Sequence, residues 1–299
     1  MKVLFATDAS PDALRAQSLI ASIAWPVPSR IQVLAVAPTI DGMLDEHASR
    51  YETLYERIRE GIDLELSDAQ QALRAPGREI ATTLLFGRPA SAIVEEACRT
   101  EADVIVVGSR GRGPIATALL GSVSAEVVDH APCPVLVART STLRGVVLAV
   151  DGSDCAREAE EVIATWPFLA APAVTVVSVA NLATVASMLD PFGTGAVDAD
   201  AYQEMIDEMR AAHERVAREA ARRLSARGLS ATPLTMDGGP VSSIIDGARL
   251  AGADLIVVGT RGRTGLARLA LGSVARGVLT HAPTSVLVVR GTASRRWST

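Results

Sequence analysis

Short apolar runs alternate along the chain with longer segments in which apolar and charged residues recur at helical spacing. In the first half, the apolar runs lie at 2–7, 31–37, 79–86, 103–108 and 134–139. The helical segments begin at Ser10-Pro11, cover roughly 43–75 and Pro89–Arg99, and resume from Ser122. Short continuous runs of β-branched residues joined by helices are typical of parallel strands that are buried on both faces. The pattern predicts an α/β domain with a parallel sheet and helices on both faces.

The second half of the chain repeats the first. Residues 86–139 align without a gap with residues 237–290, at an offset of 151, and 27 of 54 positions are identical. Near the start of each copy, TDAS (7–10) matches VDGS (150–153) at an offset of 143. A repeat of this length predicts two tandem domains.

The two offsets differ by eight residues, which predicts an insertion in the second copy. The stretch 187–200, rich in Pro, Gly and Asp, is the expected place for it. We expect the domains at about 1–140 and 144–290. A short joint near Ser141–Leu143 separates them, and a polar tail follows at 291–299.

A glycine-rich segment follows the predicted fourth strand of each copy. In the first copy Gly108-Ser109-Arg110-Gly111 is followed, nine residues later, by Gly121-Ser122. The second copy has Gly259-Thr260-Arg261-Gly262 and then Gly272-Ser273 at the same spacing. In open parallel sheets, ligands bind at the carboxyl ends of the strands, where these segments lie. A single glycine-rich turn is weak evidence, but the same spacing twice favours a ligand site.

The residue types in this segment suit an anion. We expect Gly108 and Gly111 to adopt positive φ and to let the backbone approach a phosphate. Arg110 and Arg112 add positive charge. A helix that opens at Gly121-Ser122 offers its first N–H groups and a hydroxyl as donors.

An aspartate ends the first strand of each copy. Asp8 is followed by Ser10, and Asp151 by Ser153. One interpretation is that these residues cap the next helix. The other is that the carboxylate faces the ligand cleft, where it binds a base or ribose or helps to hold a cation.

These residues together resemble the universal stress protein family, in its nucleotide-binding branch. The most specific element is the motif G-x2-G-x9-G-[ST], which both copies match in full. The resemblance covers nearly the whole chain. It implies a flavodoxin-like domain, also described as adenine nucleotide α-hydrolase-like, with a five-stranded parallel sheet that binds ATP and forms dimers.

Residue by residue, the resemblance places the base and ribose near Ala6, Asp8 and Val36, with Val107 in the pocket lining. It places the phosphates at Gly108, Gly111, Gly121, Ser122 and Val123. The second-copy matches are Ala149, Asp151, Val179, Val258, Gly259, Gly262, Gly272, Ser273 and Val274. One departure is visible, because the glycine usual after the aspartate is kept as Gly152 but replaced by Ala9.

Composition excludes several classes of protein. Lys2 is the only lysine, so a phosphate-loop NTPase with G-x-x-x-x-G-K-[ST] and a Schiff-base enzyme are excluded. The net charge is −5, without a basic stripe, and we expect no nucleic-acid partner. Charges interrupt every apolar run before it could span a bilayer, so we expect no membrane partner and a cytoplasmic location.

The repeat also removes rival sites. Cys98, Cys133 and Cys155 correspond to Arg249, Thr284 and Asp12, so no cysteine recurs and no metal site is expected. His130 and His281 do recur, in HAP sequences that are typical of a helix end before a proline. His47 and His213 lie in charged helical segments and are predicted to be on the surface.

The leading hypothesis is a binding and signalling module. Adenine nucleotide, as ATP with or without Mg²⁺, would change its conformation or its partner binding with little or no turnover. The alternative is a slow ATPase, or a phosphoryl or nucleotidyl transferase, that uses the same pocket. A nucleotide-free dimerisation scaffold is a third hypothesis, which the intact double motif disfavours. The apolar fifth strands predict intramolecular pairing of the domains through Val135–Val137 and Val286–Val288, with a weaker homodimer of chains.

Overall fold

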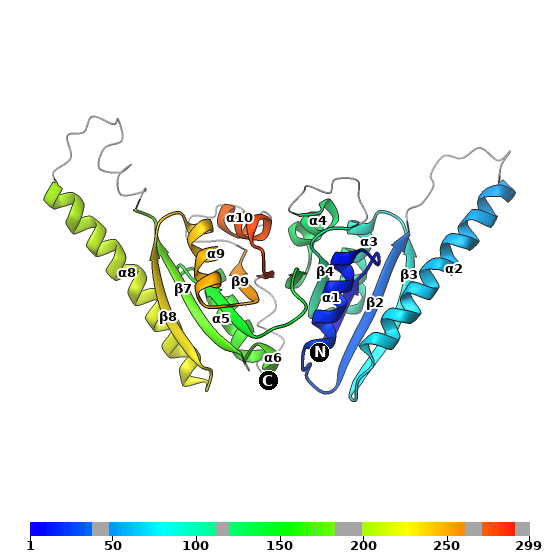
Figure 1. Ribbon diagram of the computed structural model, residues 1–299, viewed down its shortest axis with the longest axis horizontal. Coiled ribbons are helices and arrows are strands. Elements are labelled where there is room, and N and C mark those ends of the chain that lie inside the picture. Colours follow the sequence, from blue (N-terminus) through cyan, green and yellow to red (C-terminus); the bar gives the residue numbers. More distant parts are fainter. Residues whose placement is uncertain (38–47, 112–119, 171, 183–198, 261–270, 291–299) are drawn as a thin grey trace. The chain divides into compact units, whose positions relative to one another are not determined.

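The computed structural model describes residues 1–37, 48–111, 120–170, 172–182, 199–260 and 271–290. Contacts divide the chain into two compact units, Met1–Thr142 and Leu143–Thr299. The joint expected near Ser141–Leu143 lies at this division. Figure 1 labels the helices and strands of each unit.

The first unit alternates strands and helices as the hydrophobic pattern predicts. Its strands are β1 (Lys2–Ala6), β2 (Ser29–Ala37), β3 (Arg78–Phe86), β4 (Val104–Gly108) and β5 (Val135–Ala138). Its helices are α1 (Pro11–Ser22), α2 (Ala48–Leu73), α3 (Pro89–Thr100) and α4 (Ser122–His130).

The second unit repeats this order. Its strands are β6 (Gly145–Ala149), β7 (Ala173–Ala180), β8 (Ala231–Asp237), β9 (Leu255–Gly259) and β10 (Ser285–Val289). Its helices are α5 (Asp154–Thr165), α6 (Pro167–Ala170), α8 (Ala199–Ala226), α9 (Pro240–Leu250) and α10 (Ser273–His281). The single turn α6 has no counterpart among the predicted elements. The insertion expected at 187–200 lies outside the described residues, except for its last two, which begin α8.

Each unit holds a parallel sheet of five strands. The strand order is β3-β2-β1-β4-β5 in the first unit and β8-β7-β6-β9-β10 in the second. In the first unit α1 and α2 cover one face, and α3 and α4 cover the other. The predicted five-stranded α/β fold is confirmed. Because β1 lies between β2 and β4, the order reverses beside β1, and this switch point is where such sheets bind ligands.

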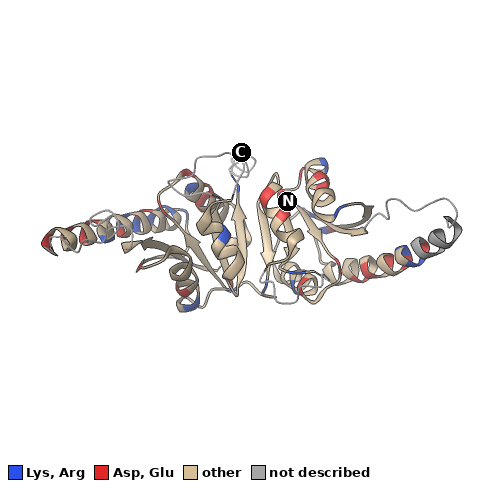
Figure 2. Ribbon diagram, turned by 90° about the horizontal axis from the view of Figure 1, so that it is seen from above, with Lys and Arg blue, Asp and Glu red and all other residues tan. Residues whose placement is uncertain are grey.

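Aliphatic strand residues form the core between the sheet and its helices. Leu4, Phe5, Ile31, Leu34 and Ile105 are buried to 1% exposure or less. Figure 2 shows Lys, Arg, Asp and Glu gathered on the helices, while the strands are nearly free of them. Strands that are apolar on both faces need this double cover, which is why their sequence runs are continuous.

Helix starts follow the capping signals of the sequence. The Ser10 hydroxyl accepts the N–H of Ala13 and caps α1, with Pro11 as the first helical residue. Ser153 caps α5 in the same way, by accepting the N–H of Ala156. Both serines follow the aspartate at the end of a first strand, so each cap positions the start of its helix beside the carboxyl end of that strand.

Candidate functional site

A cavity of about 520 Å³ opens at the carboxyl ends of the central strands of the first unit. All nine residues that the sequence predicts for the first copy line it: Ala6, Asp8, Val36, Val107, Gly108, Gly111, Gly121, Ser122 and Val123. The fold thus brings together residues from β1, β2, β4, the glycine-rich loop and α4. A volume of this size suits a small-molecule ligand.

One wall of the cavity is apolar. Leu34 and Val36 lie on the same face of β2, two residues apart, and Ile93 of α3 and Val107 of β4 complete the wall. Arg110, which the sequence singles out for its charge, also lines the cavity. The sequence prediction missed Ala13, Pro89 and Ile93, because they lie in α1 and α3, which only the fold brings near. It also missed four residues close in sequence to the predicted ones: Thr7, Leu34, Leu120 and Ser124. Strand alternation could have identified Leu34 from its distance of two residues to Val36.

The backbone of the glycine-rich loop corrects the sequence prediction. Neither Gly108 nor Gly111 has a positive φ. A Cβ on Gly108 would lie 2.8 Å from the backbone N of Ala13 and from the carbonyl carbon of Asp12. A Cβ on Gly111 would lie 2.5 Å from Oδ2 of Asp8. These glycines are required because other groups approach them closely, and not because of their backbone dihedral angles.

The start of α4 supplies N–H donors to the cavity. The N–H of Gly121 donates to the carbonyl of Ser109 at 2.7 Å and ties the helix start to the loop. The first intrahelical bond runs from the N–H of Ala125 to the carbonyl of Gly121, at 3.0 Å. Ser122, Val123 and Ser124 therefore precede it, in the first turn, where helix geometry leaves N–H groups without an intrahelical acceptor. Such a turn favours an anion.

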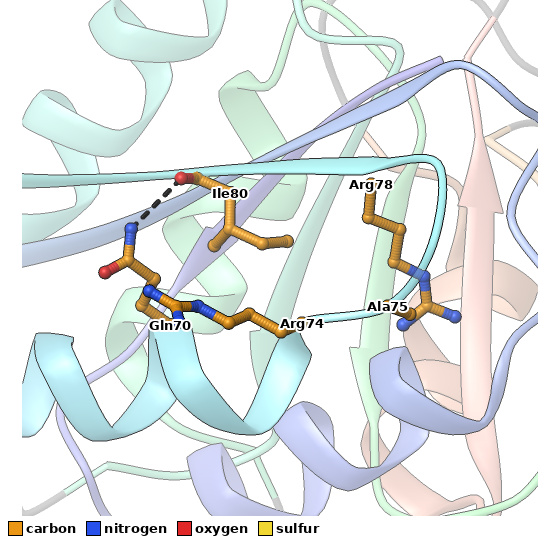
Figure 3. A pocket seen from close by; sticks show the side chains of 5 residues that line it. All are labelled: Gln70, Arg74, Ala75, Arg78 and Ile80. Atoms are coloured by element: carbon orange, nitrogen blue, oxygen red, sulfur yellow. Dashed lines mark hydrogen bonds between the residues drawn. The ribbon is translucent and has the colours of Figure 1, made fainter.

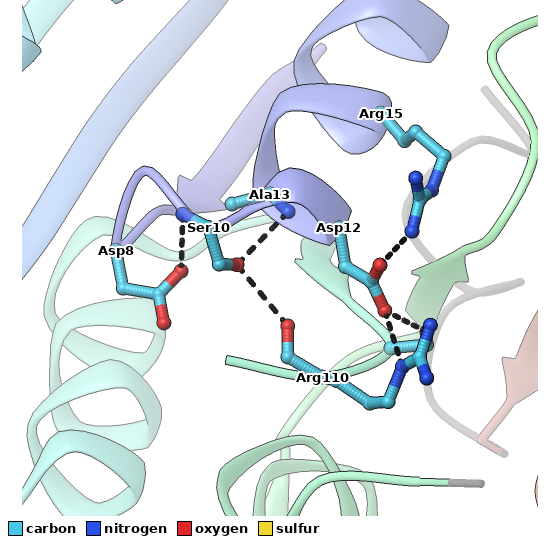
Figure 4. Close-up of polar contacts among 7 residues, drawn as sticks. Asp8, Ser10, Asp12, Ala13, Arg15 and Arg110 are labelled. Carbon is cyan, nitrogen blue, oxygen red and sulfur yellow. Dashed lines mark hydrogen bonds and ion pairs between the residues drawn. The ribbon is translucent and has the colours of Figure 1, made fainter. Parts of the chain in front are cut away.

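Asp8 does not cap α1, since Ser10 has that role. Oδ1 of Asp8 accepts the N–H of Ser10 at 3.0 Å, and the Ser10 hydroxyl donates to the carbonyl of Arg110 at 3.2 Å (Figure 4). Asp8 also lines the cavity. Of the two interpretations of this aspartate, the geometry favours the one in which it faces the cleft.

A buried carboxylate that the sequence prediction missed lies behind the loop. Asp12 of α1 is 4% exposed, and its Oδ2 accepts the Ser109 hydroxyl at 2.5 Å and the Arg110 Nε–H at 3.0 Å. Its Oδ1 pairs with Arg15 (Figure 4). Burial raises the pKa of Asp12, but the hydrogen bonds from Arg110 and Ser109 and the charges of Arg15 and Arg110 outweigh it, so the pKa lies below its ordinary value. The positive charge expected from Arg110 is thus engaged in an ion pair, and Arg112 lies outside the described residues.

The second unit builds the same backbone frame. Oδ1 of Asp151 accepts the N–H of Ser153 at 3.0 Å, and the N–H of Gly272 donates to the carbonyl of Thr260 at 2.7 Å. A Cβ on Gly259 would lie 2.5 Å from the carbonyl oxygen of Cys155. The predicted residues take the corresponding places at the ends of β6, β7 and β9 and the start of α10: Ala149, Asp151, Val179, Val258, Gly259, Gly272, Ser273 and Val274. Gly262 lies outside the described residues.

The two frames differ at the place of the buried Asp12. Cys155 occupies the place of Asp12, 143 residues later in the sequence. The Thr260 hydroxyl, the counterpart of Ser109, lies 3.9 Å from Cys155 Sγ. Cys98, Cys133 and Cys155 form no disulfide bond. Within the described residues, no cluster of three or more His, Cys, Asp or Glu could hold a metal ion.

One histidine prediction is wrong. His213 of α8 is half-buried, and its Nδ1 lies 2.8 Å from the hydroxyl of Ser178 of β7. His130 and His281 end α4 and α10 as predicted, each with Nδ1 2.9 Å from the carbonyl four residues earlier. His47 lies outside the described residues.

A second cavity, of about 480 Å³, lies between the end of α2 and the start of β3 (Figure 3). Its polar groups serve the fold. The Arg78 guanidinium donates to the carbonyl of Ile23 at 2.6 Å, and Gln70 donates to the carbonyl of Ile80 at 3.1 Å. Since β3 begins at Arg78, this cavity lies at the amino end of that strand, away from the switch point. It contains none of the predicted site residues.

Solved structures support the fold. The crystal structure of a universal stress protein from Archaeoglobus fulgidus matches with a TM-score of 0.67 and 20% sequence identity, covering 97% of this chain and 98% of that one. At this identity the match shows the fold only. In the part of the chain that the structure describes, no helix is both long enough and apolar enough to cross a membrane.

Sequence comparisons identify the family. A universal stress protein of Thermus aquaticus is 37% identical over 137 residues, which cover 46% of this chain and 97% of the relative. One from Mycobacterium tuberculosis is 28% identical over 231 residues, or 74% of this chain and 73% of the relative. The model of the universal stress protein family matches residues 1–139 and again residues 142–290. The chain therefore belongs to the universal stress protein family and carries two of its domains in tandem.

Proposed function

We propose that this chain is an ATP-binding stress-response module whose nucleotide occupancy modulates its conformation or its binding of a partner. The observation that carries the proposal is the convergence of nine predicted residues on one cavity at the switch point of the first unit. The second unit repeats the loop, the aspartate and the helix start in sequence and in backbone hydrogen bonds. We therefore propose one nucleotide in each domain.

We assign a different part of the cavity to each part of the proposed ligand. The apolar wall of Leu34, Val36 and Val107 suits the adenine ring, and Asp8 suits a ribose hydroxyl or a cation that accompanies the phosphates. The loop backbone at Gly111 and the first turn of α4 suit the phosphates. ATP with or without Mg²⁺ fits this division.

The site offers little for rapid phosphoryl transfer. Fast transfer generally needs a group that neutralises the developing charge and a residue that positions the attacking oxygen. In the first unit the Arg110 guanidinium is paired with Asp12, and no histidine is among the described residues that line the cavity. We therefore propose turnover far below the ~1–100 s⁻¹ of kinases. The alternative of a slow ATPase or transferase would use the same pocket.

Calorimetry on nucleotide-stripped protein tests the proposal. The expected result is close to two ATP bound per chain. In a steady-state assay with Mg²⁺, phosphate release should be far slower than the ~1–100 s⁻¹ turnover of kinases. The identity of any nucleotide that copurifies with the protein gives an independent check. Absence of adenine nucleotide binding would contradict the proposal. Rapid Mg²⁺-dependent release that Asp8→Ala and Asp151→Ala eliminate would replace it with an ATPase.

Three further proposals concern the assembly and the location of this module. Within its own unit, β5 is the last strand of the sheet, as β10 is in the second unit. Apolar strands at such a position invite pairing, and we propose that the two domains pair through them and that whole chains form a weaker homodimer. Cys98, Cys133 and Cys155 form no disulfide bond, which fits a reducing compartment, so we propose a cytoplasmic location.

A further inference from the structure

We propose that Asp12 is a positioning residue that withholds the Arg110 side chain from the phosphates of a nucleotide in the first copy. The inference rests on the proposed nucleotide binding and concerns the specificity of that same site. Asp12 would lower the preference of the first copy for ATP over AMP. The first copy would then hold phosphates mainly through N–H groups of its backbone.

The contacts of Asp12 fix the Arg110 side chain. Arg110 lines the cavity, but its Nε–H donates to Oδ2 of Asp12 at 3.0 Å. The same Oδ2 accepts the Ser109 hydroxyl, and Oδ1 pairs with Arg15, so both carboxylate oxygens are occupied. Asp12 is 4% exposed, and hydrogen bonds between charged groups are strong in such a place. The guanidinium is therefore held toward α1 (Figure 4).

The loop backbone is held by other bonds. The carbonyl of Arg110 accepts the Ser10 hydroxyl at 3.2 Å, and the carbonyl of Ser109 accepts the Gly121 N–H at 2.7 Å. Neither bond involves the Asp12 side chain. Removal of the Asp12 charge should therefore release the guanidinium while the loop keeps its path.

Pairing also changes what a phosphate experiences. A guanidinium that faces the phosphates attracts each added phosphate charge. The Arg110 guanidinium is instead held at 3.0 Å from Asp12. The single negative charge of this carboxylate also acts on Arg15 and on the half-buried Arg139. Asp12 therefore fixes the place of the Arg110 charge and offsets that charge in part. The first copy should therefore gain less from the β- and γ-phosphates of ATP than a site with a free cation would gain.

The second copy shows that the fold does not need this carboxylate. Cys155 takes the place of Asp12, and its Sγ lies 3.9 Å from the Thr260 hydroxyl. Gly259 packs against the backbone of Cys155, just as Gly108 packs against that of Asp12. The shared backbone frame persists without the acid. Asp12 is therefore best explained by its effect on the charge of the loop.

The experiment measures the first copy within the full chain. The protein is photolabelled with 8-azido-ATP, and labelled peptides from residues 1–142 report the first copy. Competition by ATP and by AMP gives the affinity ratio of the two nucleotides there. In Asp12→Asn, which keeps the size of the side chain and can still accept the Ser109 hydroxyl, this ratio should rise about fivefold. The rise should shrink at high salt because it comes from a partly exposed charge.

Arg110→Gln is the decisive control, because it alters an exposed side chain. Alone, it should change the ratio by less than about twofold, since Asp12 already holds the charge that it removes against α1 and offsets it in part. Combined with Asp12→Asn, it should return the ratio to the wild-type value. A tenfold loss of ATP affinity in Arg110→Gln alone would overturn the inference, as would an unchanged ratio in a folded Asp12→Asn chain. Failure of ATP and AMP to compete for the label in the wild-type chain would instead remove the proposed function.

Discussion

In the first copy, Oδ2 of Asp8 lies 2.5 Å from the point that a Cβ on Gly111 would occupy. The carboxylate at the end of β1 thus rests against the loop that follows β4. Gly111→Val should push Asp8 away from the N–H of Ser10 and fill the approach to the phosphates. ATP affinity at the first copy should fall at least about tenfold, at a cost to the free energy of unfolding of about 1 kcal/mol. Calorimetry should then count one site per chain in place of two.

Gly61→Val is the matched control for this substitution. Gly61 lies on the exposed side of α2, and a Cβ there would meet no atom within 4 Å. Two sites per chain should remain in this variant. Two sites of unchanged affinity in Gly111→Val would show that the glycine-rich loop is only a turn.

Ala9 has φ +52°, whereas its counterpart Gly152 has φ +82°. The left-handed conformation is strained for alanine and not for glycine, so the first unit carries a cost that the second avoids. Ala9→Gly should stabilise the first unit by up to about 1 kcal/mol, and Gly152→Ala should destabilise the second by about 1 kcal/mol. A Cβ on Gly152 would make only ordinary contact, 3.5 Å from Val216, so the cost there comes from the backbone. Hydrogen exchange in urea, followed by peptide, measures each unit separately. If Ala9→Gly did not stabilise the first unit and Gly152→Ala did not destabilise the second, the proposed backbone strain at Ala9 would be contradicted.

Acid should unfold the first unit before the second. Hydrogen bonding by Arg99 lowers the pKa of Glu96, against the effect of burial, and the pKa of Asp12 is also lowered, since its hydrogen bonds and neighbouring charges outweigh burial. Each carboxylate binds its proton more readily when unfolded, so its stabilisation is complete above about pH 5 and is lost as the pH falls through the lowered pKa. The counterparts in the second unit are Gly247 and Cys155. Hydrogen exchange in urea between pH 7 and pH 3, corrected for the pH dependence of intrinsic exchange rates, measures the stability of each unit. The free energy of unfolding should fall more steeply with falling pH in residues 1–142 than in the second unit.

The double variant Glu96→Gln with Asp12→Asn provides the control for the acid prediction. It should lower the stability of the first unit at pH 7 and flatten its dependence on pH below about pH 5. An equally steep loss in this variant would assign the acid sensitivity to other groups.

The proposed pairing of the domains predicts how an isolated half behaves. Residues 1–140, taken alone, should dimerise at micromolar concentration through the strand that contains Val135 and Val137, because its partner strand has been removed. The double variant Val135→Asp and Val137→Asp should stay monomeric, since charges on an apolar edge oppose pairing. Light scattering distinguishes the two outcomes. A monomeric wild-type half would rule out this edge as the pairing surface.

The sequence was sufficient for the fold because its signals are local and occur twice. Continuous apolar runs predicted the strands within a few residues, and Ser10-Pro11 predicted the start of α1. The reason for a glycine at position 108 was harder to predict. A Cβ there would lie 2.8 Å from the backbone of α1, and this close approach joins elements far apart in the sequence. The partnership of His213 with Ser178 is long-range in the same way.

Asp12 escaped prediction for a different reason. Recurrence in both copies was the strongest guide to function, and Asp12 does not recur, because Cys155 takes its place. A test for recurrence finds what two copies share and overlooks what sets them apart. Only the contacts of the Asp12 carboxylate with Ser109 and Arg110, which the fold creates, identify it as part of the site.

The exchange of Asp12 for Cys155 gives the fused chain an option that a homodimer of single domains lacks. In a homodimer, any substitution alters both pockets at once. In one polypeptide, the side chains of the two pockets can diverge while their backbones stay alike. Gly108 and Gly259 show the retained backbone, since each lies close to the backbone of the helix that faces it. Pockets that rank ATP and AMP differently report on the ratio of the two nucleotides as well as on their amount. A duplicated gene can in this way encode a sensor of cellular energy charge that has two different nucleotide preferences in one polypeptide.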